Sequence, residues 1–324
     1  MKPRIYIARG LPEPVAAYLE EHCECRYWQG PRDITEEHLA EEIGDAEGLL
    51  VTGTPIGQAV LEAGSSLRVI SNLSAGYNNL DLQALQERKL IATHTPYVLD
   101  ETVADLAMAL LLATARRVTA LDRLVKEGGW IKGMDTELYG LDVHHKRLGI
   151  IGMGRIGEAI ARRAVLGFEM DVVYYNRRRK PEAEERYGLR YCSIDELLDA
   201  SDFVLLMTPL TPETKHLMNE AQFARMKKTA IFVNVSRGEN VNEDALIRAL
   251  QKGQIAGAGL DVYEYEPIST EHPLLQMNNV VTLPHIGSAT AETRLNMAFA
   301  AARNLVHALT GQTPVQIVPE LQQQ

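Results

Sequence analysis

Cysteine is scarce in this chain of 324 residues, which contains Cys23, Cys25 and Cys192 and no C-x-x-C pair. An odd, unpatterned set of thiols does not build a disulfide framework and is typical of a protein from a reducing compartment. Because Cys23 and Cys25 are two residues apart, they would share one face of a strand. We expect them to be small buried hydrophobic residues, and no metal site is predicted.

Long apolar runs are missing as well. The most apolar stretch, residues 103–115, contains Asp105 and is too short to span a bilayer, so it predicts a buried helix. The first residues, MKPRIYIARG, do not have the apolar run of a signal peptide. We therefore expect a cytoplasmic protein that does not bind a membrane.

The chain has no excess of positive charge. Its 33 Lys and Arg residues face 43 Asp and Glu residues, which gives a formal net charge of −10. A nucleic-acid-binding surface needs a basic patch that displaces counterions, so we expect no nucleic-acid partner. The acidity is typical of a soluble globular protein. The length is sufficient for about two domains with cores of their own.

Short apolar segments rich in β-branched residues alternate with helical patterns along the chain. Several are apolar throughout, as expected for strands that are covered on both faces of a parallel sheet. This alternation predicts an α/β, doubly wound architecture. The predicted strands include 4–8, 48–52, 67–73, 148–152, 171–175, 203–207, 230–235 and 255–262, and a further strand is expected to end at the segment 283–287.

The pattern also predicts a division into domains. Residues 101–288 hold the densest series of strands and helices and are expected to bind the dinucleotide. Residues 1–100 form a smaller α/β set, expected to bind the substrate, with the boundary just before a long helix that begins near Glu101. Residues 289–324 are typical of an amphipathic helix with a polar tail. If that helix returns to the first domain, the small domain is discontinuous and a cleft separates two lobes.

The segment LGIIGMGRIG carries the spacing G-x-G-x-x-G at Gly152, Gly154 and Gly157. Gly152 would permit a tight turn, Gly154 would let a pyrophosphate approach the backbone, and Gly157 would let helix and strand pack closely. The amides of Arg155 and Ile156 would then point at the phosphates. The motif alone is weak, and a glycine-rich turn without a ligand is the alternative. Its position between a buried strand and a helical pattern favours a dinucleotide site.

The next predicted strand ends at Asn176 and is followed by three arginines. A site that prefers NAD usually has an acid here, which accepts hydrogen bonds from the ribose. A neutral side chain followed by guanidinium groups suits a 2′-phosphate instead. We predict that NADP(H) is preferred, with NAD(H) possible, and that Arg177 and Arg178 make the main contacts. A solvated basic turn before a helix at 181–187 is the alternative.

Three further segments, NVSRG, GLDVYEYEP and LPHIG, each follow a predicted strand. In a doubly wound sheet, ligands bind at the carboxyl ends of the strands. Reduction of a 2-keto acid needs a cation that holds the carboxylate and polarises the ketone, and Arg237 fits. It also needs a proton donor, for which His285 fits, and a carboxylate that orients this imidazole, for which Glu266 fits. Each residue alone has an ordinary structural explanation, but the combination favours catalysis.

Across essentially its whole length the chain resembles the D-isomer-specific 2-hydroxyacid dehydrogenase family. The motifs that carry this likeness are SAGYNNLD, HTPYVLDETVAD, GMGRIG, NVSRG, GLDVYEYEP and PHIG. The resemblance implies a Rossmann dinucleotide-binding domain with a smaller, flavodoxin-like substrate domain. It also implies that the catalytic residues are Arg237, Glu266 and His285, two of which, Arg237 and His285, also bind the substrate.

The same resemblance assigns further residues to the cofactor, the substrate and a partner subunit. It implies that Asp261 contacts the nicotinamide carboxamide and that Thr102 and Pro209 flank the cofactor. It implies a homodimer, with the helix from Glu101 at the interface. The substrate carboxylate would bind the backbone amides of the loop Ser74, Ala75 and Gly76.

Residues 139–157 and 176–191 look most like the bacterial glyoxylate/hydroxypyruvate and 2-ketogluconate reductase branch, which favours NADPH. The chain is therefore expected to reduce small 2-keto acids to D-2-hydroxy acids. One alternative is an NAD-dependent dehydrogenase of the phosphoglycerate type, which the basic turn and the missing regulatory domain disfavour. Another is a non-catalytic dinucleotide-sensing scaffold. Substrate choice would depend on Tyr77, Leu99, Trp130 and Met134.

Overall fold

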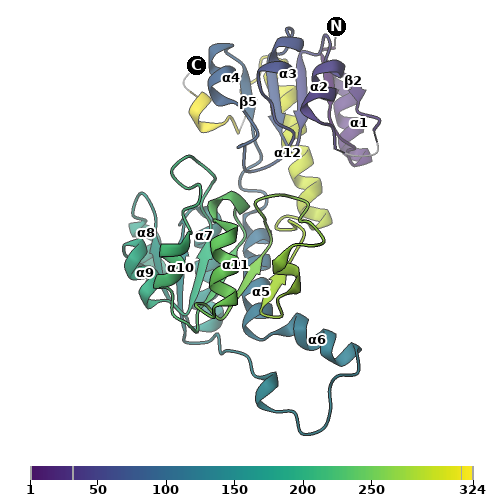
Figure 1. Cartoon of the computed structure of the whole chain (residues 1–324). Helices are drawn as coiled ribbons and strands as arrows, with labels where there is room; N and C mark the ends of the chain where they lie inside the picture. The colour runs from purple at the N-terminus through teal and green to yellow at the C-terminus, as the bar shows by residue number, and fades with distance from the viewer. Residues whose placement is uncertain (1, 31–32, 315, 323–324) are drawn as a thin grey trace. The chain divides into compact units, whose positions relative to one another are not determined.

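The structure is a computed structural model that describes residues 2–30, 33–314 and 316–322. It divides into two compact units (Figure 1). Unit 1 consists of residues 1–99 and 288–324, and unit 2 of residues 100–287. Each unit is built around its own parallel sheet, so the predicted α/β fold class is confirmed.

The sheet of unit 1 has the strand order β2-β1-β3-β4-β5, with every neighbouring pair parallel. This is the flavodoxin-like order, in agreement with the prediction. Strands β3 and β4 are buried along their whole length because helices cover both faces of the sheet. The strands are β1 (Arg4–Ile7), β2 (Glu24–Tyr27), β3 (Gly48–Val51), β4 (Val69–Asn72) and β5 (Ile91–Thr93).

The helices of unit 1 come from both ends of the chain. Helix α12 (Ala291–Leu309) packs on β3, β4 and β5 and beside α1 (Glu13–His22). The hydroxyl of Ser71 in β4 donates a hydrogen bond of 2.8 Å to the carbonyl of Ala301 in α12. A second layer contains α2 (Glu36–Glu42), α3 (Gln58–Ala63) and α4 (Leu82–Glu87).

The sheet of unit 2 has the strand order β12-β11-β10-β9-β6-β7-β8 and is also parallel throughout. The chain enters at β6, runs outward to β8, and then starts again beside β6 with β9. Open α/β sheets bind ligands at such a switch point. The strands are β6 (Arg147–Ile151), β7 (Asp171–Tyr175), β8 (Arg190–Tyr191), β9 (Phe203–Leu206), β10 (Ile231–Asn234), β11 (Gly257–Leu260) and β12 (Val280–Thr282).

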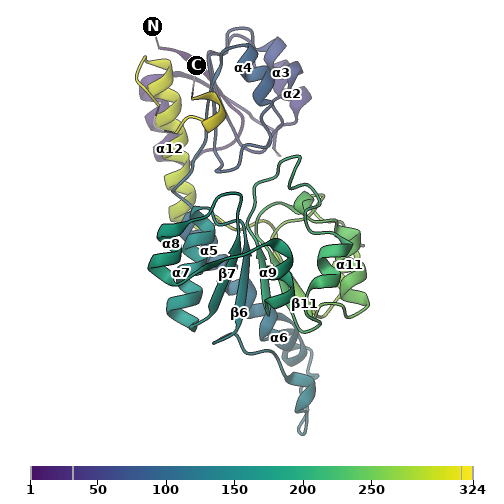
Figure 2. The same ribbon diagram turned by 90° about the vertical axis from the view of Figure 1, so that its left-hand side faces the viewer.

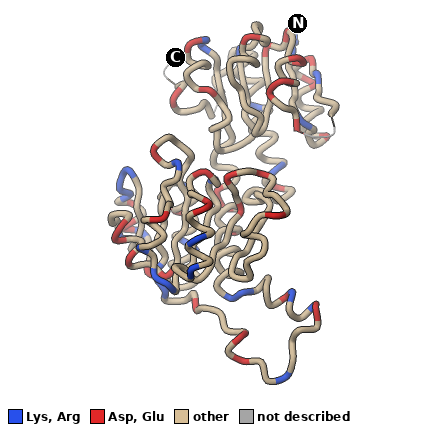
Figure 3. Tube along the Cα trace, viewed as in Figure 1, with Lys and Arg blue, Asp and Glu red and all other residues tan. Residues whose placement is uncertain are grey.

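Helices cover both faces of this second sheet (Figures 1 and 2). On one face α5 (Asp100–Ala115) packs against α7 (Arg155–Phe168), and α8 (Pro181–Tyr187) contacts α7. The other face carries α9 (Ile194–Ala200), α10 (Glu220–Arg225) and α11 (Glu243–Gln251). Within the described residues, no helix is long and apolar enough to cross a membrane. Figure 3 shows that acidic and basic residues occur in both units.

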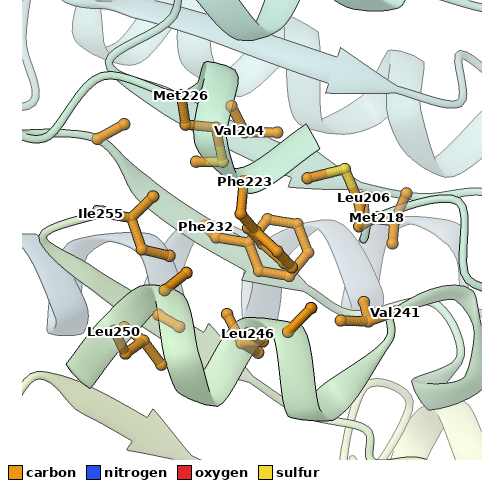
Figure 4. Close-up of a cluster of buried hydrophobic side chains, with 14 of the residues drawn as sticks. Val204, Leu206, Met218, Phe223, Met226, Phe232, Val241, Leu246, Leu250 and Ile255 are labelled. Carbon is orange, nitrogen blue, oxygen red and sulfur yellow. The ribbon is translucent and has the colours of Figure 1, made fainter. Parts of the chain in front are cut away.

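Side chains from β9, β10, α10 and α11 meet in the core beneath the second of these helical layers (Figure 4). The rings of Phe223 and Phe232 pack edge to face, with centroids 5.4 Å apart. Leu206 and Leu246 are among the aliphatic residues around them. Full burial of a side chain of this size contributes about 2 to 3 kcal/mol. This core fixes the positions of the strands whose ends carry the predicted catalytic residues.

The segment after α5 is largely exposed. Helix α6 (Val118–Lys126) has no buried residue among those described, and with the following segment it extends away from the rest of unit 2 (Figure 1). Helix α5, where the sequence analysis places a dimer interface, packs apolar residues against α7, β10 and β11 of its own unit. Large apolar side chains are exposed on α6 and on residues 127–141: Val118, Val125, Trp130, Ile131 and Tyr139.

The strands rich in apolar residues lie where the sequence predicts them, and the predicted strand 171–175 has the same ends as β7. Three short strands were not predicted: β2, β5 and β8. Strands β2 and β8 are edge strands with exposed or half-buried residues, so they have no continuous apolar run. Cys23 is buried just before β2, whereas Cys25 within the strand is half-buried. Both are free thiols.

Candidate active site

The turn between β6 and α7 has space for a ligand at one glycine only. Gly152 has φ +107°, and a Cβ there would lie 2.6 Å from the backbone of Met207. A Cβ on Gly157 would lie 2.4 Å from the carbonyl oxygen of Gly152, so this close contact of helix and turn also requires glycine. At Gly154, by contrast, no atom of a described residue outside its chain neighbours and its own helix backbone lies within 4 Å of the Cβ position. A pyrophosphate can therefore approach the backbone there.

Helix α7 begins directly after this open position. Its N-cap is Gly154, and no side chain of a described residue caps the helix. The first amides of a helix lack intrahelical acceptors and carry partial positive charge, so those of Ile156 and Gly157 suit a phosphate. The Nε of Arg155 donates to the Oδ2 of Asp100 at 2.9 Å, which ties α7 to the start of α5. The turn fits a dinucleotide.

All three arginines of the basic turn after β7 are exposed, but they differ in their partners. Asn176 donates from Nδ2 to the carbonyl of Arg178 at 2.9 Å, which closes the turn on itself. Arg177 and Arg178 are exposed and form no salt bridge with any residue that the structure describes. Arg179 is different, because it is paired with Glu184. The sequence did not predict this pairing.

The two residues expected beside the cofactor lie on different elements of unit 2. Thr102 is half-buried in the first turn of α5. Pro209 is exposed in the loop that follows β9, the strand next to β6. Its carbonyl accepts a hydrogen bond of 2.6 Å from the hydroxyl of Thr214, which shapes the loop. Pro209 thus follows a strand at the switch point of the sheet.

The structure brings the imidazole of His285 and the carboxylate of Glu266 together. Strands β10, β11 and β12 are neighbours in the sheet, and the loops after them carry Arg237, Glu266 and His285 in that order. The Nδ1 of His285 and the Oε2 of Glu266 are 2.6 Å apart. The imidazole is about half exposed, and its Nε2 has no hydrogen bond to a described residue. This nitrogen can therefore serve a ligand.

Glu266 is held as a carboxylate. Its Oε1 accepts from the amide of Tyr263 at 3.0 Å while Oε2 faces His285. Burial acts to raise the pKa of Glu266, but hydrogen bonds from His285 and Tyr263, with the charges of His285 and Arg237, outweigh it and lower the pKa. The group is therefore ionised at neutral pH and can orient the imidazole.

Arg237 lies within electrostatic reach of Glu266. Its side chain is half-buried, and Nη1 donates to the carbonyl of Ser236 at 2.7 Å. Burial lowers the pKa of Arg237, and the charge of Glu266 opposes this effect. A Cβ on the next residue, Gly238, would overlap the backbone of Tyr263 at 1.8 Å. The loop that carries Arg237 is thus pressed against the loop that carries Glu266.

Asp261 supports the backbone around His285. Its two carboxylate oxygens accept from the amides of Ile286 and Gly287 at 2.8 and 2.9 Å, and its carbonyl accepts from the amide of His285 at 2.9 Å. His285 has φ +52°, an uncommon conformation for a residue with a side chain. Burial raises the pKa of Asp261, although these amides oppose the shift. The sequence did not predict this structural role.

In unit 1 the loop after β4 has its carbonyls bonded and two of its amides available. The amides of Ala75 and Gly76 donate no hydrogen bond to a residue that the structure describes. The carbonyls of the predicted loop, Ser74, Ala75 and Gly76, accept from the Thr95 amide, the His94 Nδ1 and the Asn72 Nδ2, respectively. Sequence reasoning missed the supports Asn72 and His94, although His94 opens the motif HTPYVLDETVAD.

The residues expected to select the substrate have diverse environments. In unit 1, Tyr77 packs edge to face on His94 at 5.1 Å and donates to Glu320, and Leu99 is buried. In unit 2, Trp130 is 65% exposed and Met134 is half-buried. Trp130 thus belongs to the exposed segment after α6 and not to the core of its unit.

Comparison with known proteins gives matches over nearly the whole chain. The family model for the NAD-binding domain of D-isomer-specific 2-hydroxyacid dehydrogenases matches residues 108–287. Glyoxylate/hydroxypyruvate reductase B of Klebsiella pneumoniae subsp. pneumoniae is 51% identical over 311 residues, which are 96% of each chain. The protein of the same name from Escherichia coli O9:H4 has the same identity and coverage.

Solved structures also match nearly the whole chain. A protein from Thermus thermophilus superimposes with a TM-score of 0.91 and 41% identity, covering 97% of this chain and 99% of its own. The NADPH-dependent glyoxylate/hydroxypyruvate reductase of Sinorhizobium meliloti, in complex with NADP and malonate, has a TM-score of 0.88 at 31% identity, with 99% and 98% covered. The strand orders, the dinucleotide turn and these matches together show that the chain belongs to the D-isomer-specific 2-hydroxyacid dehydrogenase family.

Proposed function

We propose that this protein is an NADPH-preferring reductase that converts small 2-keto acids, such as glyoxylate, hydroxypyruvate and 2-ketogluconate, to D-2-hydroxy acids. The observation that carries the proposal is the 2.6 Å contact between His285 and the carboxylate of Glu266, with Arg237 within electrostatic reach. In this proposal these three residues are the catalytic groups. The similar proteins named glyoxylate/hydroxypyruvate reductase B support the choice of substrates.

The chemistry divides between the cofactor and the side chains. A bound nicotinamide dinucleotide supplies the hydride for the 2-keto carbon. His285 donates a proton from Nε2 to the oxygen that becomes the hydroxyl, and Glu266 stabilises the charged imidazole before the transfer. Arg237 holds the substrate carboxylate and stabilises negative charge on the reacting oxygen.

We assign the dinucleotide to unit 2 and further substrate contacts to unit 1. The available amides of Ala75 and Gly76 support binding of a carboxylate, because two adjacent N–H groups match its oxygens. In unit 2, Asp261 would contact the carboxamide of the nicotinamide. This role adds to its bonds with the amides of Ile286 and Gly287, since each carboxylate oxygen accepts more than one hydrogen bond.

We infer the preference for NADPH from the turn after β7. Asn176 leaves no carboxylate that would repel a 2′-phosphate, and Arg177 and Arg178 are exposed for contact with it. The similar Sinorhizobium meliloti enzyme is described as NADPH-dependent and was solved with NADP, which supports the assignment.

A steady-state assay tests the proposal. Each of the three acids would be offered with NADPH and with NADH, and the loss of absorbance of the reduced cofactor would be followed. We expect turnover of at least one acid, with a higher kcat/KM for NADPH than for NADH. No turnover of any acid would favour the scaffold alternative. Faster reaction with NADH, or oxidation of 3-phosphoglycerate alone, would favour the NAD-dependent dehydrogenase.

A further inference from the structure

We propose that Tyr174, Arg179 and Glu184, here named the turn clamp, hold the basic turn 176–180 in the shape that selects NADPH. In this arrangement Arg179 is a positioning residue and does not bind the 2′-phosphate itself. The inference rests on the proposed NADPH preference, which it extends from Arg177 and Arg178 to the side chains that hold their backbone.

The centre of the clamp is the hydroxyl of Tyr174. The side chain is fully buried in β7, and its hydroxyl accepts from the amide of Lys180 at 2.7 Å. The same hydroxyl donates to the Oε1 of Glu184 at 2.6 Å. Burial, together with the bond to Glu184, raises the pKa of Tyr174 to about 12, so the hydroxyl keeps its proton. One buried side chain therefore connects the end of the turn to α8.

Arg179 completes the clamp from the turn side. Its Nε donates to the Oε1 of Glu184 at 3.1 Å, and its Nη2 donates to Oε2. The guanidinium and the carboxylate therefore form a bidentate pair. The guanidinium carbon also lies 5.6 Å from the centroid of the Tyr191 ring. The bonds from Arg179 and Tyr174 lower the pKa of Glu184. Arg179 thus donates its hydrogen bonds to a residue of the protein itself.

The turn is consequently fixed on both sides of Arg177 and Arg178. Before them, the carbonyl of Tyr175 accepts from the amide of Gly152 at 2.9 Å, which connects the turn to the phosphate-binding glycines. After them, Arg179 and the amide of Lys180 are held by the clamp. A guanidinium selects phosphate by geometry, so orientation of Arg177 and Arg178 depends on a rigid backbone.

The clamp makes a prediction opposite to that of direct phosphate binding. If Arg179 were a phosphate ligand, removal of the Glu184 charge would release it and strengthen NADPH binding. If Arg179 is a positioning residue, the same change loosens the turn and weakens NADPH selectively. The sign of the effect therefore separates the two roles.

The test uses Glu184→Gln and Tyr174→Phe in the full chain, with kcat/KM measured for NADPH and for NADH. We expect the ratio of the two values to fall roughly tenfold in both variants, which corresponds to a loss of about 1.4 kcal/mol in discrimination. Glu185→Gln is the matched control, because it removes the same charge from the next, exposed residue of α8 and should leave the ratio unchanged. An unchanged or higher ratio in Glu184→Gln would overturn the clamp.

A second measurement without cofactor keeps the two proposals distinguishable. Hydrogen exchange of residues 175–180 should be faster in both variants than in the unmodified protein. Tyr174→Phe removes the acceptor of the Lys180 amide, and Glu184→Gln removes the charge that holds Arg179. Equal exchange rates would overturn the clamp whichever cofactor the enzyme prefers. A wild-type protein that prefers NADH would contradict the proposed function, while exchange would still decide whether the clamp exists.

Discussion

At the scale of single residues, His285 combines an uncommon backbone conformation with a half-exposed imidazole. The carboxylate and carbonyl of Asp261 hold the backbone on both sides of it, and Glu266 holds the ring. Such preorganisation keeps a proton donor in place before the substrate arrives. The position of the imidazole is therefore determined by two carboxylates on the loop after β11.

The proposed role of His285 predicts a specific kinetic defect. His285→Ala should lower kcat by about 10²- to 10⁴-fold, the usual contribution of a general acid, because no other group replaces its proton. Since the cofactor is assigned to other residues, the Kd for NADPH, measured by fluorescence titration, should change by less than about twofold. His144→Ala, a change at an exposed histidine of the same unit, is the control. A loss confined to NADPH affinity would contradict the role.

The catalytic grouping could be predicted from the sequence because each candidate follows an apolar strand, and parallel strands end at a common edge. The contacts behind these residues could not. Arg179 looks the same as its two neighbours in the sequence, and only its bonds with Glu184 separate them. The support of His285 by Asp261 depends on the conformation of a loop, which no periodicity encodes.

At the scale of elements, the dinucleotide turn has one tolerant glycine, Gly154, and two intolerant ones, Gly152 and Gly157. Gly154 has φ −85° and open space at its Cβ position, so Gly154→Ala should leave the melting temperature nearly unchanged. The new methyl group would occupy the space of the pyrophosphate, and we expect the Kd for both NADPH and NADH to rise roughly tenfold or more. Isothermal titration calorimetry and thermal unfolding would measure the two effects.

Gly152→Ala is the contrasting variant. Its φ of +107° and the 2.6 Å approach to Met207 predict a loss of stability of about 1 to 3 kcal/mol. If Gly154→Ala were as unstable as Gly152→Ala, or bound both cofactors normally, the assignment of the open position to the pyrophosphate would be wrong.

Asp171 connects three strands at the other end of this sheet. Its Oδ2 accepts from Arg147 of β6 at 2.7 Å and from Arg190 of β8 at 2.6 Å. Burial acts to raise the pKa of Asp171, but the two arginines outweigh it and the pKa lies below 3.8. The carboxylate therefore stabilises the fold above pH 3.8, and this contribution disappears as the pH falls through the lowered pKa.

The corresponding variant is Asp171→Asn. Because the pair is partly exposed, we expect the free energy of unfolding at pH 7 to fall by less than about 1 kcal/mol. The difference from the unmodified protein should shrink as the pH is lowered below 3.8. Urea denaturation at several pH values would measure it. A difference that grows on acidification would contradict the sign of the shift.

The elements themselves were predictable to different degrees. Strands such as β7 and β9 were found because each contains a run of buried apolar residues. Strand β8 was missed because it has two exposed residues at a sheet edge, and it depends on β7 and on Asp171 for its position. Local sequence carries little information about a strand whose stabilising contacts are all tertiary.

At the scale of the whole molecule, we propose that the exposed apolar side chains after α5 form part of the interface of the homodimer expected from the sequence. Val125 and Ile131 are 55% and 65% exposed. A second copy of the chain would cover such residues and remove their apolar surface from water. We therefore expect α6 and residues 127–141 to take part in the interface.

Sedimentation velocity tests this prediction. We expect the unmodified protein to sediment as a dimer at micromolar concentration, and Val125→Asp with Ile131→Asp to shift it towards monomer, because a buried charge opposes association. Leu166→Asp changes an equally exposed apolar residue on α7 and should leave the dimer intact. A monomeric unmodified protein would disprove the proposal.

The return of α12 to unit 1 has a consequence for synthesis on the ribosome. Residues 100–287 of unit 2 are translated as one uninterrupted stretch, whereas unit 1 needs both its first 99 residues and the segment from 288. Strands β3 and β4 are covered by α12, whose buried residues include Met297 and Leu305. During translation, the first 99 residues therefore keep one apolar face of their sheet uncovered until unit 2 and then α12 have been synthesised.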